Sequence, residues 1–558
     1  MNDSMRRVAA VLLVILGGAA LWWADSGAAG SASANDAMVA TMAAARERAA
    51  ANDSRLKGAL RFEQGGWIYV HLEGPPGAMG YQHGYLLAPE IEDAFAAVSA
   101  GMRHSTKRDW EFFRRAAREM LWPKIDTEYQ QELQGIVEGL RARTGSKLDV
   151  DDIVAFNAFE ELPDYYVPWL NKQQKTGLAP DLKSPGNCSA FVATGSWTKD
   201  GQIVMAHNNW TSYRNGERWR IVFDIAPKNG YRILMDGFPG VIASDDDFGI
   251  NSDGLMVTET TITQFEGWDP NGKPEFVRAR KALQYAGSID EYTNIILDGN
   301  NGGYANDWLL GDRKTGEIAQ LELGLRAHQL WKTKDGVLAG SNWARDPQVL
   351  KEDAPQFDPA DKESSPNARR ARWDELLKEN KGKIDVALAQ QMLGDHRDTA
   401  QHKEEANERT LCGHVDGSSR GVPEWDWQPY YPGGAVQGKV TDATMAGEMR
   451  TMARMGHPCG GDFLAKPFLA SHPEYVWQEP YLRDMKRSMD GVPVRPSPER
   501  IRPILKKRGR RTVGEERRQG VRKHQHGAAN PQPGYSGPQE HPGKNQADHT
   551  KHNGNIRS

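Results

Sequence analysis

Cysteine is scarce in this chain, which has three cysteines among 558 residues, so the position of each thiol is informative. The sequence contains no dinucleotide-binding motif, no P-loop and no zinc-ligand spacing of a known type. These absences argue against a nucleotide-dependent enzyme or a zinc protein. We therefore expect no cofactor, no bound metal ion and no nucleic-acid partner.

Long apolar runs are missing beyond the first 34 residues. The start has Arg6 and Arg7, an apolar run over residues 8–23, and small residues that end in Ala32-Ser33-Ala34. This layout is typical of a cleaved export signal. An uncleaved membrane anchor is the alternative, because Trp22 and Trp23 suit a membrane interface. We expect an exported protein, periplasmic or secreted, whose body is soluble.

Charge is unevenly spread, although the net charge is only -4. Residues 491–558 hold 15 Lys and Arg against 5 Asp and Glu, with much Pro, Gly and Gln. Such a composition cannot bury a core, which predicts a disordered tail over 488–558. This tail could contact a membrane surface or another anionic polymer. Its histidines could instead bind metal.

The three cysteines are an odd number for an oxidising compartment, where thiols tend to pair. Cys412 and Cys459 both lie in the C-terminal third, and we expect them to form a disulfide. Cys188 is then left over. A buried, inert thiol is one explanation, but turn residues precede Cys188 and a strand-like run follows it, so this thiol begins a strand.

The stretch around Cys188 reads as a hairpin, with Asp200-Gly201 as the turn signal. Antiparallel pairing then places Cys188 within a residue or two of the segment 209–213. The returning strand would deliver His207, Asn208 and Trp210 to the thiol. A cut before Cys188 would free an α-amine, whose pKa suits a general base at neutral pH. The sequence therefore predicts an N-terminal-nucleophile hydrolase matured at the Asn187–Cys188 bond.

Several ordered motifs resemble the phospholipase B-like family. They are "GNCSAF", "MAHNNW", "DGFPGVIASDDDFGINSDGLMVTETTI", "NNGGYANDWLLGD" and "LCGHVDGSSRG". Upstream segments are similar to the autoproteolytic group that includes the isopenicillin-N acyltransferases. The resemblance implies that Cys188 is the nucleophile, that His207 and Trp210 line the site, and that Asn306 forms part of the oxyanion hole.

A site arginine also follows from the resemblance, and Arg345 in "SNWARD" is the candidate. Asn208 and Asn209 are expected to contact substrate. Other residues have plainer interpretations. We expect Asp245-Asp246-Asp247 to form a turn rather than a metal site, and His83 to be a core histidine. Trp425, Trp427, Tyr430 and Tyr431 could line a cleft or pack a loop.

The expected fold class is α+β, and the resemblance implies the αββα sandwich of N-terminal-nucleophile hydrolases. Strand-like runs include 241–244 and 255–263, and a helix is expected over 275–297. We expect a signal peptide at 1–34, a mostly helical N-terminal fragment at 35–187 that is retained after self-cleavage, and a catalytic core at 188–487.

These observations predict an exported enzyme that hydrolyses acyl ester or amide bonds, with glycerophospholipids as the substrates that the resemblance suggests. An N-acyl amidase or acyltransferase is the first alternative. A relative that binds lipid or another ligand without turnover is the second.

Overall fold

A computed structural model describes residues 53–174, 188–246, 248–486 and 492–494. The chain divides into two compact units, 1–495 and 496–558, and the described residues all belong to the first. The predicted signal peptide, the loop before Cys188 and most of the basic tail lie outside the described residues. Every helix in the described part is too short or too polar to cross a bilayer.

The larger sheet has nine strands in the order β1-β2-β5-β6-β7-β8-β9-β10-β11, antiparallel except for the parallel pair β2 and β5. Its strands are β1 Leu60–Gln64, β2 Trp67–Gly74, β5 Ile221–Pro227, β6 Ile233–Gly237, β7 Gly249–Asn251, β8 Leu255–Thr261, β9 Asn306–Asp312, β10 Glu317–Leu323 and β11 His328–Thr333.

The smaller sheet has six strands in the order β12-β3-β4-β15-β16-β17. They are β3 Cys188–Thr194, β4 Val204–Ser212, β12 Gly336–Gly340, β15 Gly433–Asp442, β16 Thr451–Met455 and β17 Val492–Val494. Strand β17 pairs with β16 inside the segment expected to be tail. The tail boundary at 488 is therefore too early, because Val-Pro-Val can form an edge strand.

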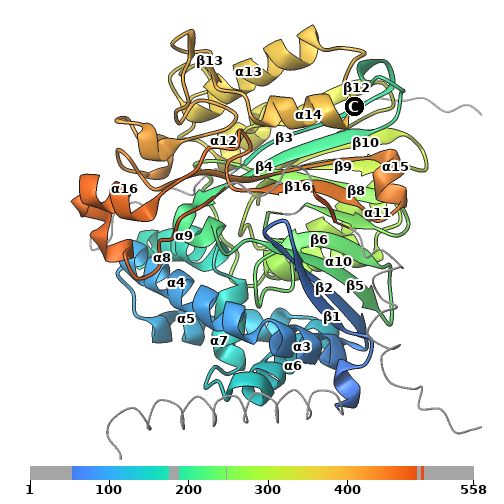
Figure 1. Ribbon diagram of the computed structural model, residues 1–558, viewed down its shortest axis with the longest axis vertical. Coiled ribbons are helices and arrows are strands. Elements are labelled where there is room, and N and C mark those ends of the chain that lie inside the picture. Colours follow the sequence, from blue (N-terminus) through green and yellow to red (C-terminus); the bar gives the residue numbers. More distant parts are fainter. Residues whose placement is uncertain (1–52, 175–187, 247, 487–491, 495–558) are drawn as a thin grey trace, which may run out of the picture. The chain divides into compact units, whose positions relative to one another are not determined.

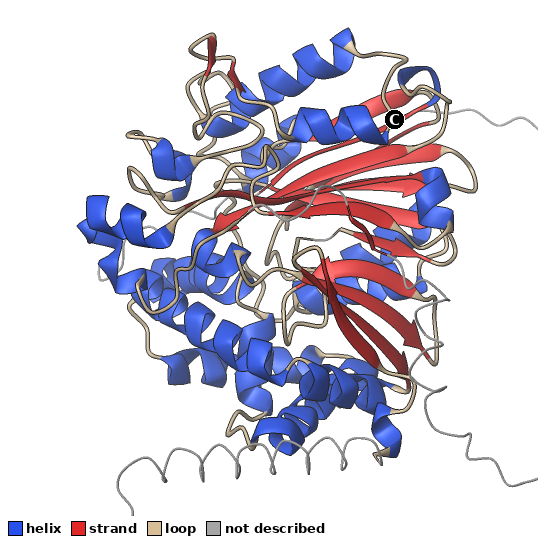
Figure 2. Ribbon diagram, viewed as in Figure 1, coloured by secondary structure: helices blue, strands red, loops and turns tan. Residues whose placement is uncertain are grey.

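The two sheets pack face to face, and helices cover both outer faces (Figures 1 and 2). Between the sheets, one hydrophobic cluster joins Val222, Met256 and Leu309 to Val192 and Met205. The outer face of the smaller sheet packs against helices α13 Ser365–Glu379 and α14 Val386–Leu393. The predicted αββα sandwich is confirmed.

The outer face of the larger sheet packs against helices from two parts of the chain. They are α3 Pro76–Leu86, α4 Ala88–Thr106, α5 Trp110–Ala116, α6 Thr127–Thr144, α7 Val150–Asn157, α8 Val167–Gln174, α10 Glu275–Tyr285 and α11 Ile289–Leu297. The helix expected over 275–297 is thus two helices, because Gly287 and Ser288 interrupt it. The strand expected at 241–244 is wrong; this buried segment has no regular structure.

The remaining elements are short. They are α9 Tyr213–Gly216, α12 Pro347–Asp353, α15 Ala443–Gly447, α16 Ala465–Ser471 and a two-stranded sheet of β13 Arg397–Asp398 and β14 Lys403–Glu404. Helices α3 and α6 approach closely because glycines face backbone at the crossing: a Cβ on Gly80 would lie 1.8 Å from the Glu132 carbonyl oxygen. Next to this crossing His83 is buried, and its Nε2 accepts the Gly240 N–H at 2.9 Å, as expected of a core histidine.

Candidate active site

Cys188 is the first residue of β3 and is completely buried. In the β3–β4 pair it lies opposite Asn209, while Ala190 lies opposite His207. The predicted pairing of Cys188 with the segment 209–213 is confirmed, at the first residue of that segment. The connection is not a tight turn at Asp200-Gly201; it is a wide loop that contains the short helical turn Gly195–Trp197.

Every polar group of Cys188 has a dedicated side-chain partner. Its backbone N–H donates to Asn342 Oδ1 at 3.2 Å, and its carbonyl accepts from Arg369 Nη1 at 2.7 Å. The thiol donates to Glu259 Oε1 at 3.4 Å. Arg369 also binds Asn342 Oδ1 at 2.8 Å and Ser189 Oγ at 2.8 Å. The amide, the carbonyl and the thiol of the first strand residue are therefore all hydrogen-bonded to side chains.

Burial dominates the electrostatics of this thiol. It raises the pKa of Cys188 well above the usual value, and the negative charges of Glu259 and Asp246 raise it further. Burial also lowers the pKa of Arg369 to about 9. In the uncut chain the thiol is thus protonated at neutral pH, and the site needs a base before sulfur can attack.

His207 lies beside the thiol. One of its ring nitrogens belongs to a group with Cys188 Sγ and a Glu259 oxygen, in which the three atoms lie within 4.8 Å of one another. Neither ring nitrogen has a hydrogen-bond partner among the described residues. Burial, followed by the charge of Lys439, lowers the pKa of His207 to about 3. The imidazole is therefore neutral at pH 7.

Two neighbours of His207 on β4 bind the strand to the end of α14 and to the loop at Leu411. Asn208 Nδ2 donates to the Leu393 and Leu411 carbonyls at 2.8 and 3.0 Å, and Trp210 Nε1 donates to the Leu411 carbonyl at 3.3 Å. The Arg369 guanidinium lies 4.5 Å from the Trp210 ring centroid. Asn209 is buried, and its Nδ2 has no partner in the described part of the chain.

Asn306 begins β9 opposite Thr261 of β8 and is completely buried. Both of its amide atoms lack a hydrogen-bond partner within the described residues. The Thr261 carbonyl accepts from Asn342 Nδ2 at 3.0 Å, which links this strand pair to the partner of the Cys188 N–H. An amide with unused donors is what an oxyanion hole requires.

The structure does not bring Arg345 to Cys188. Its guanidinium lies 3.8 Å from the Trp331 ring centroid and its Nε lies 3.9 Å from Glu322. Arg369 is the arginine in contact with Cys188. Sequence reasoning missed it because nothing distinguishes it from the other arginines of "SPNARRARWDEL". Glu259 was also missed, although a glutamate within the buried run "LMVTETT" indicates a residue with a specific partner or function.

A buried ion pair lies between the sheets near the thiol. Lys439 Nζ binds Asp236 Oδ2 at 2.6 Å and also contacts Asp246. Asp245 has a positive φ of 64°. Asp245 and Asp246 lie in a bend of the chain, and Asp246 is paired with Lys439, a partner that the sequence did not predict. Asp247 lies outside the described residues.

The predicted disulfide between Cys412 and Cys459 is not formed, and both thiols are free. Each sulfur instead lies 3.5 Å from His414 Nε2. The Cys412 thiol, followed by His396 and His414, lowers the pKa of Cys459 far below its usual value.

The chain is similar to known proteins over part of its length. The Phospholipase B family model matches residues 78–333, which include Cys188, His207, Trp210 and Asn306. The resemblance to the phospholipase B-like family is confirmed. Phospholipase B-like protein F of Dictyostelium discoideum is 33% identical over 177 residues, covering 30% of this chain and 31% of that protein.

An uncharacterised protein of Archaeoglobus fulgidus is 26% identical over 265 residues, covering 45% of this chain and 42% of its own length. The chain thus aligns with less than half the length of these curated relatives. Among solved structures, a mutant of the conjugated bile acid hydrolase from Clostridium perfringens shares 14% identity with a TM-score of 0.29, covering 48% of this chain and 89% of that one.

Proposed function

We propose that this phospholipase B-like chain is a hydrolase that cuts its own Asn187–Cys188 bond and then uses Cys188 to cleave acyl esters or amides. The observation that carries the proposal is the set of contacts at Cys188: the amide nitrogen, the carbonyl and the thiol each have a buried side-chain partner. A structural cysteine has no need of such fixation, whereas an N-terminal nucleophile must be held in one geometry.

Self-cleavage follows from the groups present. Sulfur attacks the Asn187 carbonyl carbon while the thiol proton passes to Glu259, 3.4 Å away. The carbon–nitrogen bond breaks, the nitrogen of Cys188 takes that proton, and a thioester remains. Water then adds its hydroxyl to the acyl carbon and returns a proton to sulfur. The products are a carboxylate at Asn187 and a free α-amine on Cys188.

The new α-amine is the base for turnover. Asn342 Oδ1, which accepts the amide N–H at 3.2 Å in the uncut chain, would accept one amine N–H and keep the lone pair available to the thiol. Sulfur attacks the substrate carbonyl carbon while the thiol proton passes to the α-amine, and Asn306 stabilises the oxyanion. The ester or amide bond then breaks, the α-amine gives the proton to the leaving alcohol or amine, and water hydrolyses the thioester to release the acid and restore the thiol. The neutral His207 would help to orient the substrate.

A hollow of about 460 Å³ beside this site suits an amphipathic substrate. It begins at Thr211 and Ser212, just beyond Asn209 on β4, and its wall includes Trp425, whose ring packs 5.9 Å from Trp210. Trp427 and Tyr431 also line it, whereas Tyr430 packs on His472. The aromatic wall would hold an acyl chain.

One end of the hollow is polar. Arg214 is buried there; its Nε donates to Asn215 Oδ1 at 3.3 Å and its guanidinium lies 5.3 Å from the Trp477 ring centroid. Glu160 also lines the hollow, and burial raises its pKa to about 7. A buried guanidinium that lines a hollow favours an anionic group such as a phosphodiester, which supports glycerophospholipids as substrates. Export and contact of the tail with membranes remain predictions.

A substrate comparison tests this proposal. Correctly cut enzyme should release fatty acid from a lysophospholipid faster than from an N-acyl amino acid. Arg214→Met should raise KM for the lysophospholipid about tenfold or more and leave a neutral acyl ester nearly unaffected, since one charge-assisted contact is lost. Arg103→Met, which removes an exposed arginine of α4, is the matched control. Faster release from the N-acyl amino acid would favour an amidase instead.

A further inference from the structure

Four side chains with metal-ligand chemistry converge outside the candidate active site. His396 follows α14, Cys412 and His414 lie in the next loop, and Cys459 follows β16. One potential ligand atom from each lies within 4.8 Å of all the others. We call these four residues the Cys2His2 cluster. Its members come from three separate segments of the chain, which is why no zinc-ligand spacing could be recognised.

The distances within the cluster match a tetrahedral ion. Zinc bonds of about 2.3 Å to sulfur and about 2.1 Å to nitrogen give a sulfur-to-nitrogen edge of about 3.6 Å at tetrahedral angles. His414 Nε2 lies 3.5 Å from Cys412 Sγ and 3.5 Å from Cys459 Sγ. Two edges of the polyhedron are thus already set without an ion.

The backbone holds the ligands in place independently of one another. The Cys412 N–H donates to the Asp395 carbonyl at 3.1 Å, and the His414 N–H donates to the Asn407 carbonyl at 3.1 Å. Cys459 Sγ accepts the Gly461 N–H at 3.3 Å, a contact that orients a thiolate ligand.

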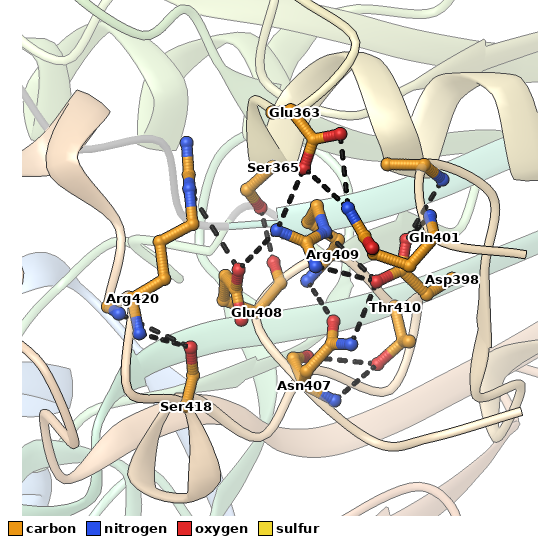
Figure 3. A network of polar contacts seen from close by, with 12 residues as sticks. Glu363, Ser365, Asp398, Gln401, Asn407, Glu408, Arg409, Thr410, Ser418 and Arg420 are labelled. Carbon is orange, nitrogen blue, oxygen red and sulfur yellow. Dashed lines mark hydrogen bonds and ion pairs between the residues drawn. The ribbon is translucent and has the colours of Figure 1, made fainter. Parts of the chain in front are cut away.

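A polar network supports the loop that carries two of the ligands (Figure 3). Arg409 binds Asp398 Oδ2 through Nη2 at 2.8 Å, and Asn407 Nδ2 donates to the same oxygen at 3.0 Å. Thr410 Oγ1 donates to the Cys412 carbonyl at 3.0 Å. The network also reaches α13, where Ser365 Oγ bonds the Glu408 carbonyl at 2.5 Å. These hydrogen bonds therefore fix the loop conformation next to the ligands Cys412 and His414.

The surroundings of His414 complete the arrangement. The His457 ring packs 3.9 Å from the His414 ring. Asp416 is already engaged, since its Oδ1 accepts the Tyr213 hydroxyl at 2.5 Å. This leaves His396, Cys412, His414 and Cys459 as the set with two sulfur and two nitrogen ligands, the donor types that zinc prefers.

We propose that the Cys2His2 cluster binds one zinc ion as a closed structural site. Four protein ligands leave no open position for a substrate or a reactive water, so the ion serves the fold rather than the chemistry. It would tie the 396–414 loop to the end of β16. Leu411, next to the ligand Cys412, bonds Asn208 and Trp210 through its carbonyl, so the ion would also steady β4.

Cobalt substitution of the purified full-length chain tests this site. Metal-free protein should take up one tightly held Co²⁺ with the visible bands of tetrahedral cobalt and the ultraviolet band that arises from thiolate-to-cobalt charge transfer. The tail histidines contain no sulfur and cannot give the second band. Cys459→Ser and His396→Gln should each weaken cobalt binding at least tenfold. His328→Gln, which changes an exposed histidine elsewhere, should leave cobalt binding and the charge-transfer band unchanged.

Cys188→Ser separates this cluster from the group of Cys188, His207 and Glu259, and it should retain the full cobalt spectrum. The wild-type protein alone also decides the matter if a variant fails to fold. Three thiols that titrate in denatured, chelator-treated protein, together with the cobalt spectrum, support the site. One thiol and a mass lower by two hydrogens would show a Cys412–Cys459 disulfide and overturn it. Three thiols without the charge-transfer band would overturn it equally.

Discussion

Cys188 and Cys459 are the same residue type in opposite environments. Cys188 is completely buried beside Glu259, and its thiol pKa is raised well above the usual value. Cys459 is half-buried beside Cys412, His396 and His414, and its thiol pKa is lowered. Burial next to a carboxylate raises the pKa of a thiol, whereas hydrogen bonds that the sulfur accepts lower it.

This difference separates two roles. The Cys459 sulfur lies with a second sulfur and two imidazoles in a group whose ligand atoms are all within 4.8 Å of one another, which is the geometry of a metal site. In the proposed mechanism Cys188 cuts its own chain with Glu259 as the proton acceptor, and turnover of substrate then uses the α-amine that the cut releases. The sequence does not show this contrast in environment, because the groups that shift each thiol pKa reach it through long-range contacts.

The largest effect should come from Cys188→Ala. No sulfur remains to attack the Asn187 carbonyl, so this variant should stay a single chain without hydrolase activity. Gel analysis and an acyl-release assay on the purified protein check both outcomes. Cys459→Ser is the matched comparison and should still be cut. Two fragments from the alanine variant would show that cleavage does not depend on Cys188.

Asn306→Ala should reduce turnover ~100-fold while the chain still matures, because one oxyanion donor is lost. The rate per mole of cut enzyme, the fragment yield and the melting temperature need to be measured together. If Asn306 only stabilises the start of β9, the rate would stay near normal and stability would fall by about 1 kcal/mol. That result would remove Asn306 from the Cys188 site.

Burial should also make stability depend on pH through a histidine outside both cysteine regions, His83. Burial lowers the pKa of His83 to about 3, so the folded state keeps it neutral while the unfolded chain takes up a proton below about pH 6.5. Between these values the unfolded state binds more protons, so stability falls as the pH falls. From pH 7 to pH 5 this one group should cost about 2 kcal/mol.

The matched variant for this prediction is His83→Gln, which retains an acceptor for the Gly240 N–H. Its free energy of unfolding should depend less steeply on pH than that of the wild type over the same interval. Parallel pH profiles of the two proteins would mean that burial does not set the protonation of His83.

The smallest effect should come from removal of the tail. Deletion from Pro496 onward leaves β17 in place and removes the separate C-terminal unit. Cleavage and the rate on a soluble short-chain ester should change by less than about twofold. A tenfold loss would place the tail in the working unit.

The sequence predicts a good part of the fold and less of the site. The β3–β4 pairing was predictable because a buried apolar run, a turn signal and a second run lie close together. The split between α10 and α11 was missed, since helical periodicity continues across Gly287 and Ser288. The two clusters depend on long-range contacts: Glu259, Asn342 and Arg369 reach Cys188 from separate elements, and spacing along the chain carries no trace of this.

Mass spectrometry of the N-termini of the purified wild-type protein tests the central claim most directly. We predict one fragment that begins at Cys188 with a free α-amine, and an upstream fragment that ends at Asn187 and remains associated with it. A catalytically active protein whose chain runs uncut through residues 187 and 188 would contradict the account, because Cys188 would then lack the base on which turnover depends.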